Sequence, residues 1–209
     1  NLAMHLKEQS ERKVLFLSLS SDQNDQRIDL SSIVYDHHKI LASIIKGVLP
    51  IDVLSVKFDK TNAAVLNKIS QFISAPVNDY NYIILDLPNE MDDVVSKILV
   101  QADIVHLVTV DRAKDLEMTR TVIDRLIISL KNKFNADNIQ VLISGMHAQM
   151  NLTSEEIKHV LNYDVFMVLP HLEQNEFNTV AINQGMSIVE ADKSSEYSRV
   201  IRHMSRKIS

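Results

Sequence analysis

The feature that most constrains this chain is a regular alternation of short apolar runs with longer stretches of helical periodicity. The apolar runs predict strands at residues 14–17, 52–56, 82–85, 104–110, 139–143 and 165–169. Between them, apolar residues recur three and four positions apart, as they do in amphipathic helices. Strands and helices in this order form parallel sheets covered by helices. We therefore expect an α/β fold, a three-layer α/β/α arrangement around a mostly parallel sheet, in a single domain over residues 1–209.

Signals for helix ends agree with this alternation. Asp36 can cap a helix that Gly47 would end. Thr153 and Glu156 have the spacing of a capping box for a short helix. Further helices are expected at the first residues of the chain, at 65–73, 91–99 and 116–130, near Phe177 and Val180, and at 197–204.

Composition excludes several classes of site. The chain has no Cys, which rules out a thiolate metal site and a Cys nucleophile. Its net charge is -5, and Lys and Arg are scattered without a basic stripe, so we expect no nucleic-acid partner. There is no signal peptide and no apolar stretch of the ~18–20 residues that a membrane span needs. We expect a soluble protein that acts in the cytoplasm. His106 lies within an apolar run, which favours a core histidine over a catalytic one.

In parallel α/β sheets, ligands bind beyond the carboxyl ends of the strands. Asp86 is the best candidate there, because it follows four apolar residues at the end of a predicted strand. A carboxylate in that place can hold Mg²⁺ through water near a nucleotide phosphate. The alternative is that Asp86 caps a helix beginning near Asn89, and position alone leaves both interpretations open.

Polar residues also follow the first predicted strand, namely Ser18, Ser20, Ser21 and Asp22. Their hydroxyls can bind phosphate or a water of Mg²⁺, although a plain polar turn is the favoured interpretation. The last predicted helix carries basic residues around an apolar stripe that includes Tyr197 and Met204. Such a helix can lie on a membrane surface or dock on its own sheet, and docking is the favoured of the two.

Three segments together resemble the MinD/ParA family of ATPases, a SIMIBI-class family with a deviant Walker A loop. Residues 80–88 resemble its Walker B segment, and residues 102–110 resemble the strand that follows, entered after Ala-Asp. Residues 183–198 resemble the family ending N-x-G … E-x-D-x-x-S-x-Y-S. Residues 1–3 resemble the helix after the phosphate loop, and Lys13 to Leu19 resemble the next strand. Within the family, the pattern is closest to the CpaE/TadZ branch, which helps to place pilus and secretion machines.

The resemblance implies a P-loop NTPase-like fold that binds ATP or ADP with Mg²⁺. Asp86 would hold Mg²⁺ through water, and the other nucleotide-binding positions would be Pro88, Asn89, Ser144 and Pro170. The chain has three glycines and no glycine cluster, so the first strand and the phosphate loop are expected upstream of Asn1. The resemblance also implies a homodimer, a protein partner in an assembly or positioning machine, and peripheral contact with the inner face of the membrane.

Two departures from the family pattern concern catalysis and base recognition. The family has Asp-x-Asp where this chain has Ser18-Leu19-Ser20, and the second aspartate belongs to switch I, which helps to position Mg²⁺ and the attacking water. Ser20 cannot supply that charge, so Asp22 would have to substitute for it. An Asn-Arg pair of the family is replaced by Ser144-Gly145, which puts base recognition in doubt.

These features leave two functions open. The first is an ATP-dependent localisation or assembly factor with weak or absent hydrolysis. The second is a non-enzymatic dimerisation and docking scaffold that has lost nucleotide turnover. A weaker third interpretation is a relative of dethiobiotin synthetase or of the nitrogenase iron protein, and the absence of Cys argues against the iron–sulfur case.

Overall fold

A computed structural model describes residues 2–9, 12–22, 26–46, 51–129, 136–145, 152–170, 189 and 192–208. The described chain forms two compact units, Ala3–Gln101 and Ala102–Ser209. The elements of the first part are α1 (Leu2–Gln9), β1 (Val14–Ser20), β2 (Ile28–Asp29), α2 (His37–Ala42), β3 (Asp52–Lys57), α3 (Ala63–Ser74), β4 (Tyr82–Asp86) and α4 (Asp93–Leu99). Those of the second part are β5 (Val105–Val110), α5 (Ala113–Ser129), β6 (Ile139–Ser144), α6 (Ser154–Leu161), β7 (Val165–Leu169) and α9 (Glu196–Ile208).

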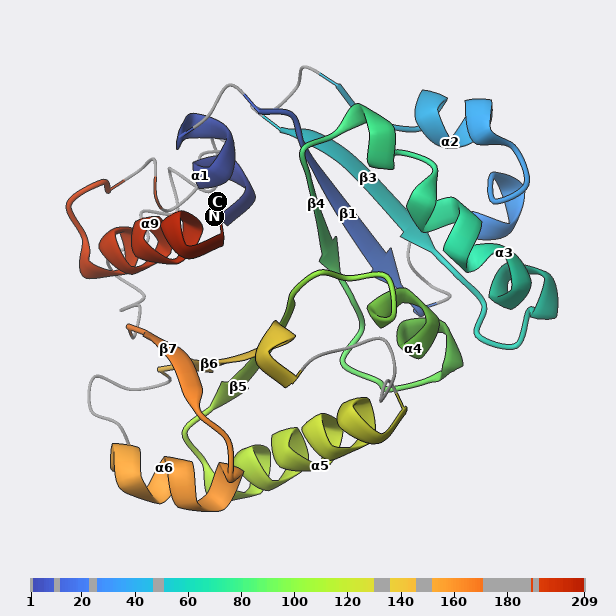
Figure 1. Ribbon diagram of the computed structural model, residues 1–209. Coiled ribbons are helices and arrows are strands. Elements are labelled where there is room, and N and C mark those ends of the chain that lie inside the picture. The colour runs from blue at the N-terminus through green and yellow to red at the C-terminus, as the bar shows by residue number, and fades with distance from the viewer. Residues whose placement is uncertain are drawn as a thin grey trace. The chain divides into compact units, whose positions relative to one another are not determined.

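The first unit is built on a four-stranded parallel sheet in the order β2-β3-β1-β4. Helices α2, α3 and α4 lie on one side of this sheet (Figure 1). Strand β1 has a neighbour on each side, and its Leu15 and Leu17 are fully buried. The two-residue strand β2 was not predicted, because so short a segment has no periodicity of its own. The six predicted strands are all present, although β1 runs on to Ser20.

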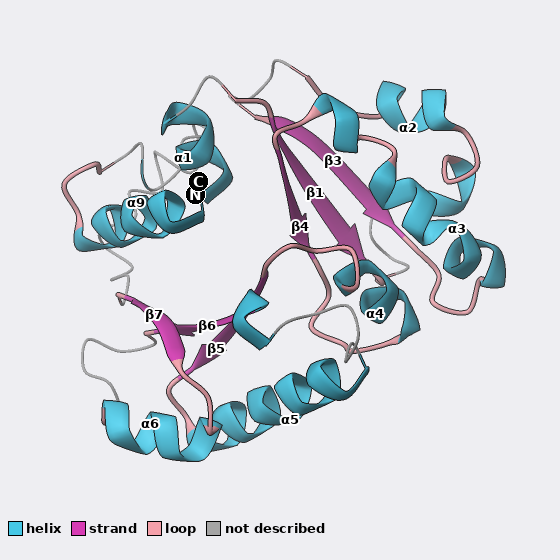
Figure 2. Cartoon of the chain, in the orientation of Figure 1, coloured by secondary structure: helices cyan, strands magenta, loops and turns pink. Residues whose placement is uncertain are grey.

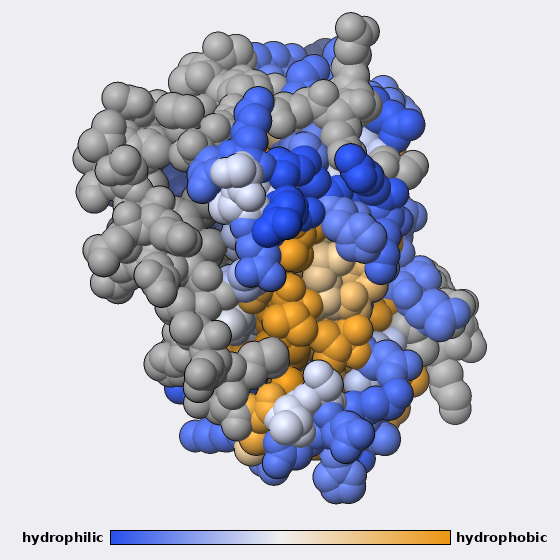
Figure 3. Space-filling view, turned by 90° about the vertical axis from the view of Figure 1, so that its left-hand side faces the viewer, coloured by the Kyte–Doolittle hydropathy of each residue, from blue (hydrophilic) through white to orange (hydrophobic). Residues whose placement is uncertain are grey.

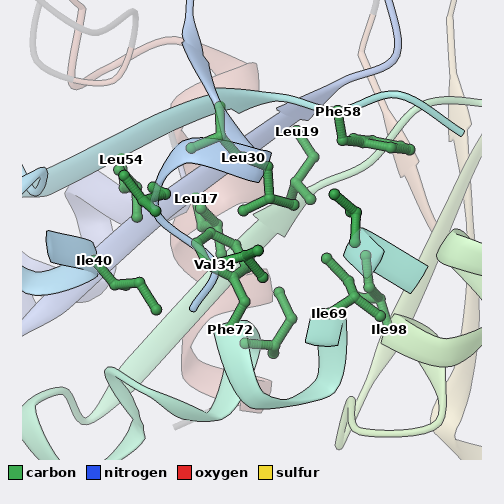
Figure 4. Packing of buried hydrophobic residues seen from close by; sticks show 14 of the residues in the cluster. Leu17, Leu19, Leu30, Val34, Ile40, Leu54, Phe58, Ile69, Phe72 and Ile98 are labelled. Carbon is green, nitrogen blue, oxygen red and sulfur yellow. The ribbon is translucent and has the colours of Figure 1, made fainter. Parts of the chain in front are cut away.

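The core of the first unit lies between this sheet and its helices (Figure 4). Side chains alternate along β1, so that every second residue, Leu15, Leu17 and Leu19, belongs to the core. Phe72 of α3 is buried in the same cluster. The alternation sends the residues between, including Ser18, to the opposite face of the sheet. The polar face of β1 is therefore a direct consequence of how its leucines pack.

Helix caps explain where the helices of this unit begin. The Asp36 side chain accepts backbone hydrogen bonds from His38 and Lys39, as the sequence predicted for α2. Asn62 caps α3 in the same way, through Ala64 and Val65. Helix α2 ends at Ala42 rather than near residue 46, and the expected role of Gly47 falls outside the described residues.

The second unit contains a three-stranded parallel sheet in the order β5-β6-β7. Helices α5 and α6 lie on one side of it (Figure 2). The predicted capping box begins α6, with Glu156 bonded to the Thr153 backbone and the Thr153 hydroxyl bonded in return. Asn162 ends the helix in the left-handed conformation, with φ of 50°. Both described sheets are parallel and flanked by helices, which confirms the predicted α/β fold. The helix expected near Phe177 and Val180 lies outside the described residues.

His106 lies on β5 and packs against the Phe166 ring of β7, with 6.2 Å between ring centroids. Burial lowers the pKa of its imidazole from the ordinary value, because the charged form loses hydration. Its Nδ1 has no hydrogen-bond partner within the described residues. The placement agrees with a core histidine, although the ring is packed rather than hydrogen-bonded at that nitrogen.

Replacing Phe72 by Ala is expected to destabilise the protein strongly, because Phe72 is 1% exposed and a cavity would remain. Substitutions of this kind cost about 3–5 kcal/mol of unfolding free energy. Urea denaturation measures the change. The exposed neighbour Gln71→Ala is the control and should change stability by about 0.5 kcal/mol or less. Equal effects of the two substitutions would contradict the assigned core.

Candidate functional site

The candidate site lies at the carboxyl edge of the first unit's sheet, where β1 meets β3 and β4. Ser18 is in register with Ser55 on one side and with Asp86 on the other. Paired residues in a sheet project from the same face, so these three polar side chains form one row. The sequence placed Ser18 and Ser20 in a turn after the strand. That interpretation was wrong, since both residues belong to β1.

Hydrogen bonds join this row. The Ser18 hydroxyl donates to Asp86 Oδ2 at 3.1 Å. Arg27 Nη1 donates to the same Ser18 oxygen at 3.0 Å. Ser18 is 4% exposed, whereas Asp86 is exposed. A buried hydroxyl needs partners, and here it orients one oxygen of an exposed carboxylate.

The loop after β4 decides between the two interpretations of Asp86. Helix α4 begins at Asp93, and its cap is Asp92, whose side chain accepts a hydrogen bond from the Val95 backbone N–H at 2.9 Å. A helix beginning near Asn89 was therefore wrong, and Asp86 does not cap α4. The carboxylate is left available for another role at the edge of the sheet.

Two neighbouring loops are tied together beside Asp86. Lys60, after β3, forms an ion pair with Glu90 and lies 3.9 Å from Asp92. In the Lys60 loop, the Thr61 hydroxyl and backbone N–H donate to Asp59 at 2.7 and 2.8 Å. These hydrogen bonds hold the pKa of the Asp59 carboxyl below its ordinary value.

Pro88 and Asn89 occupy the loop between Asp86 and Glu90, with Pro88 half-buried and Asn89 exposed. The structure therefore brings both of these predicted binding residues next to Asp86 along the chain. Asp22 is exposed, and its backbone N–H donates to the Ser20 hydroxyl at 3.2 Å. Ser20 and Asp22 are thus neighbours at the end of β1, as the sequence requires for any shared role.

The remaining predicted binding residues belong to the second unit. Ser144 ends β6 and is in register with Leu169 at the end of β7. The Gly145 backbone N–H donates to the Leu169 carbonyl at 3.0 Å, and Pro170 follows directly. Ser144 and Pro170 therefore share the carboxyl edge of the β5-β6-β7 sheet. Asp111, at the end of β5 on this edge, is almost fully buried.

The residues at Asp86 fit a magnesium ion that arrives with a nucleotide. The described chain contains no group of three or more His, Cys, Asp or Glu side chains able to hold a metal. Mg²⁺ usually keeps several waters and is held by one or two carboxylates together with substrate phosphates. A single exposed carboxylate, oriented by Ser18, meets that requirement but does not make a metal centre without the phosphates.

Arg27 is the site residue that sequence reasoning missed. It follows a polar stretch and belongs to no motif, and its contact with Ser18 depends on a strand pairing between distant segments. A cation so close to a predicted phosphate site was a possible signal, but spacing alone could not bring it there.

The family-like ending of the chain has a structural role in the second unit. The Asp192 carboxylate accepts hydrogen bonds from the backbone of Ser194 and Ser195. The Ser195 hydroxyl accepts from the Ser198 backbone N–H at 3.2 Å, and Ser198 donates its own hydroxyl to the Asp192 carbonyl. These bonds start helix α9. The helix contacts β7, where Lys207 lies over the Phe166 ring at 4.9 Å. Within the described residues, no helix is long and apolar enough to cross a membrane.

Comparison with known proteins identifies the fold. The sequence matches no protein-family model, and no curated protein is significantly similar to it. The structure, in contrast, resembles P-loop ATPases of the ParA and MinD type over nearly its whole length.

Three solved structures illustrate the likeness. A ParA family ATPase from Chlorobium tepidum TLS has a TM-score of 0.77 at 16% identity, covering 98% of this chain and 90% of that one. MinD in the MinC:MinD complex of Aquifex aeolicus has a TM-score of 0.76 at 18% identity, with 99% and 86% covered. MinD from Pyrococcus horikoshii OT3 in complex with Mg-ADP has a TM-score of 0.73 at 16% identity, with 100% and 87% covered. The chain has the fold of MinD/ParA ATPases.

Removing the Ser18 hydroxyl is expected to destabilise the first unit modestly. Ser18→Ala deletes two hydrogen bonds made by a buried side chain, and losses of this kind cost about 1–2 kcal/mol. Ser20→Ala, more exposed on the same strand, is the matched control and should cost less. Urea denaturation compares the two. A Ser18→Ala protein as stable as the wild type would contradict the network described for Ser18.

Proposed function

We propose that the chain is a nucleotide-dependent localisation or assembly factor that binds ATP or ADP with Mg²⁺. The observation that carries the proposal is the position of Asp86, an exposed carboxylate at the carboxyl end of β4 that is oriented by Ser18 and does not cap a helix. Ligands of parallel α/β sheets bind at this edge. The likeness to MinD bound to Mg-ADP gives the nucleotide as the chemically consistent ligand.

In this proposal, each residue of the edge has a limited task. Mg²⁺, when bound, neutralises charge on the phosphate oxygens. Asp86 accepts a hydrogen bond from water in the magnesium shell, and Ser18 keeps the carboxylate turned toward the edge. Pro88 and Asn89 would border the nucleotide from the loop after β4. Ser144 and Pro170 are proposed as binding residues on the carboxyl edge of the second unit's sheet.

Weak hydrolysis follows from the charges on β1. Ser18 and Ser20 are neutral, whereas the family pattern has aspartates there. The second aspartate would help to position Mg²⁺ and the attacking water, and a serine hydroxyl cannot supply its charge. Asp22 lies next to Ser20 and is the residue that we propose as a partial substitute.

A protein partner and a homodimer are part of the same proposal. MinD of Aquifex aeolicus has been solved in complex with MinC. Large apolar side chains are exposed on the described surface, among them Val108, Met118, Ile128 and Val168. Figure 3 shows apolar surface exposed on one face of the molecule. Exposed apolar surface of this kind commonly marks contacts with other proteins.

Two finer points rest on the sequence resemblance. Assignment to the CpaE/TadZ branch, with a role in a pilus or secretion machine, is one. Peripheral contact of α9 with the inner face of the membrane is the other. The basic residues Arg206 and Lys207 in the last turn of α9 are compatible with such contact.

The alternative function is a dimerisation and docking scaffold that binds no nucleotide or does not turn it over. The absence of carboxylates at Ser18 and Ser20 favours it. Under this alternative, the hydrogen bonds of Ser18 serve only to complete the packing of the sheet. Nucleotide binding distinguishes the two functions directly.

Replacing Asp86 by Asn is expected to weaken Mg-ATP binding about tenfold without unfolding the domain, because the neutral amide loses its attraction for the magnesium shell. Titration calorimetry on the natural full-length protein gives the affinity. Asp79→Asn, at the opposite end of β4, is the matched control and should leave binding unchanged. Equal affinity of the wild type and Asp86→Asn would defeat the role assigned to Asp86.

Turnover of ATP is expected to be slow, and Ser20→Asp should raise it. Restoring a carboxylate at this place gives the attacking water a charged partner, and general-base assistance is worth about a hundredfold or more when well placed. We expect an increase of about tenfold in phosphate release, measured with saturating Mg-ATP. A wild-type kcat of about 10 s⁻¹, the median value for enzymes, would show that the serines do not limit hydrolysis.

A further inference from the structure

Arg27 lies immediately before the edge strand β2, which pairs with β3. The β2–β3 register, continued by one residue, brings Arg27 beside Ser55. Ser55 is in register with Ser18, and Ser18 is in register with Asp86. One row across four strands therefore begins with a guanidinium-bearing residue and ends with a carboxylate-bearing one.

The hydroxyl of Ser18 connects the two ends of this row. It donates its proton to Asp86 Oδ2 at 3.1 Å, and its oxygen accepts from Arg27 Nη1 at 3.0 Å. Ser18 is 4% exposed, so this position of the guanidinium is fixed by a buried partner. A serine holds the guanidinium without neutralising it, whereas an aspartate at the same place would form an ion pair with it.

The row carries one positive and one negative charge. The MinD/ARA-type pattern, written for this sequence as aspartates in place of Ser18 and Ser20, would add two negative charges to Asp86. With neither of them present, the edge attracts a divalent cation less strongly and accepts phosphate oxygens more readily. Arginine suits that task, because its planar guanidinium remains charged and its N–H groups match phosphate geometry.

We propose that Arg27 is a phosphate-binding residue of this edge, whose guanidinium contacts the phosphoryl oxygens of the bound nucleotide. The inference rests on the proposed function, since it requires nucleotide phosphates to reach the carboxyl edge of β1 and β4. Arg27 supplies positive charge beside the single carboxylate, so nucleotide binding depends less on Mg²⁺ than it would with Asp86 alone.

The test compares Arg27→Gln with Arg12→Gln in the full-length protein. Both substitutions remove one guanidinium, but Arg12 lies just before β1, at the amino end of the same sheet, where it contacts Tyr82. Calorimetry with ATP is carried out once with Mg²⁺ and once with EDTA. We expect Arg27→Gln to weaken ATP binding about ten- to hundredfold, with the larger loss in EDTA. Arg12→Gln should stay within about twofold of the wild type in both conditions.

Arg27→Lys separates a charge effect from a folding effect, because it keeps the positive charge and loses the planar fork. It should recover part of the affinity, and the urea midpoint of each variant shows whether the fold is retained. If Arg27→Gln and Arg12→Gln bind ATP equally well, Arg27 does not bind phosphate, while the proposed function stands. If the wild type fails to bind ATP at millimolar concentration, the proposed function is overturned, and the role of Arg27 with it.

Discussion

The pairing of β1 with β3 on one side and with β4 on the other is the constraint on which the candidate site depends. It places Ser18 between Ser55 and Asp86 and sends Leu17 and Leu19 into the core on the opposite face. A shift of β4 by one residue would turn Asp86 to the core face, because side chains alternate along a strand. The leucines that stabilise the sheet therefore also fix the position of the carboxylate. Stability of the core and geometry of the site have one cause.

Charge distinguishes this edge from the family pattern that the sequence resembles. Where that pattern has aspartates, β1 has neutral hydroxyls, and one of them is bonded to Arg27. Such an edge is better suited to holding phosphate than to activating water. The likeness in fold is close while identities are 16–18%, so the fold has been kept where the charges differ. Binding without efficient turnover is consistent with a switch or a scaffold, and both need a stable fold more than a fast reaction.

Local signals explain which parts of this structure could be predicted. The strands are apolar runs, and the caps at Asp36 and Thr153 are short-range contacts, so both can be found from neighbouring residues in the sequence. Asp86 was found because it directly follows such a run. Arg27 was not, since its contact with Ser18 depends on the pairing of the two-residue strand β2 with β3. The start of α4 was misplaced because Asp86 and Asp92 are equally good caps by residue type, and only the backbone geometry selects Asp92. Whether residues 1–209 form a single domain stays a prediction.

The central claim is that nucleotide phosphates bind at the carboxyl edge of β1 and β4. Backbone amide chemical shifts of the ¹⁵N-labelled full-length protein, followed by NMR during titration with Mg-ATP, test it most directly. The account predicts that the largest shift changes fall at residues 18–22, 26–27 and 86–90, which surround Ser18 and Asp86. Largest changes at the opposite end of the sheet, around residues 12–13 and 80–82, would contradict it, as would unchanged shifts at millimolar ATP.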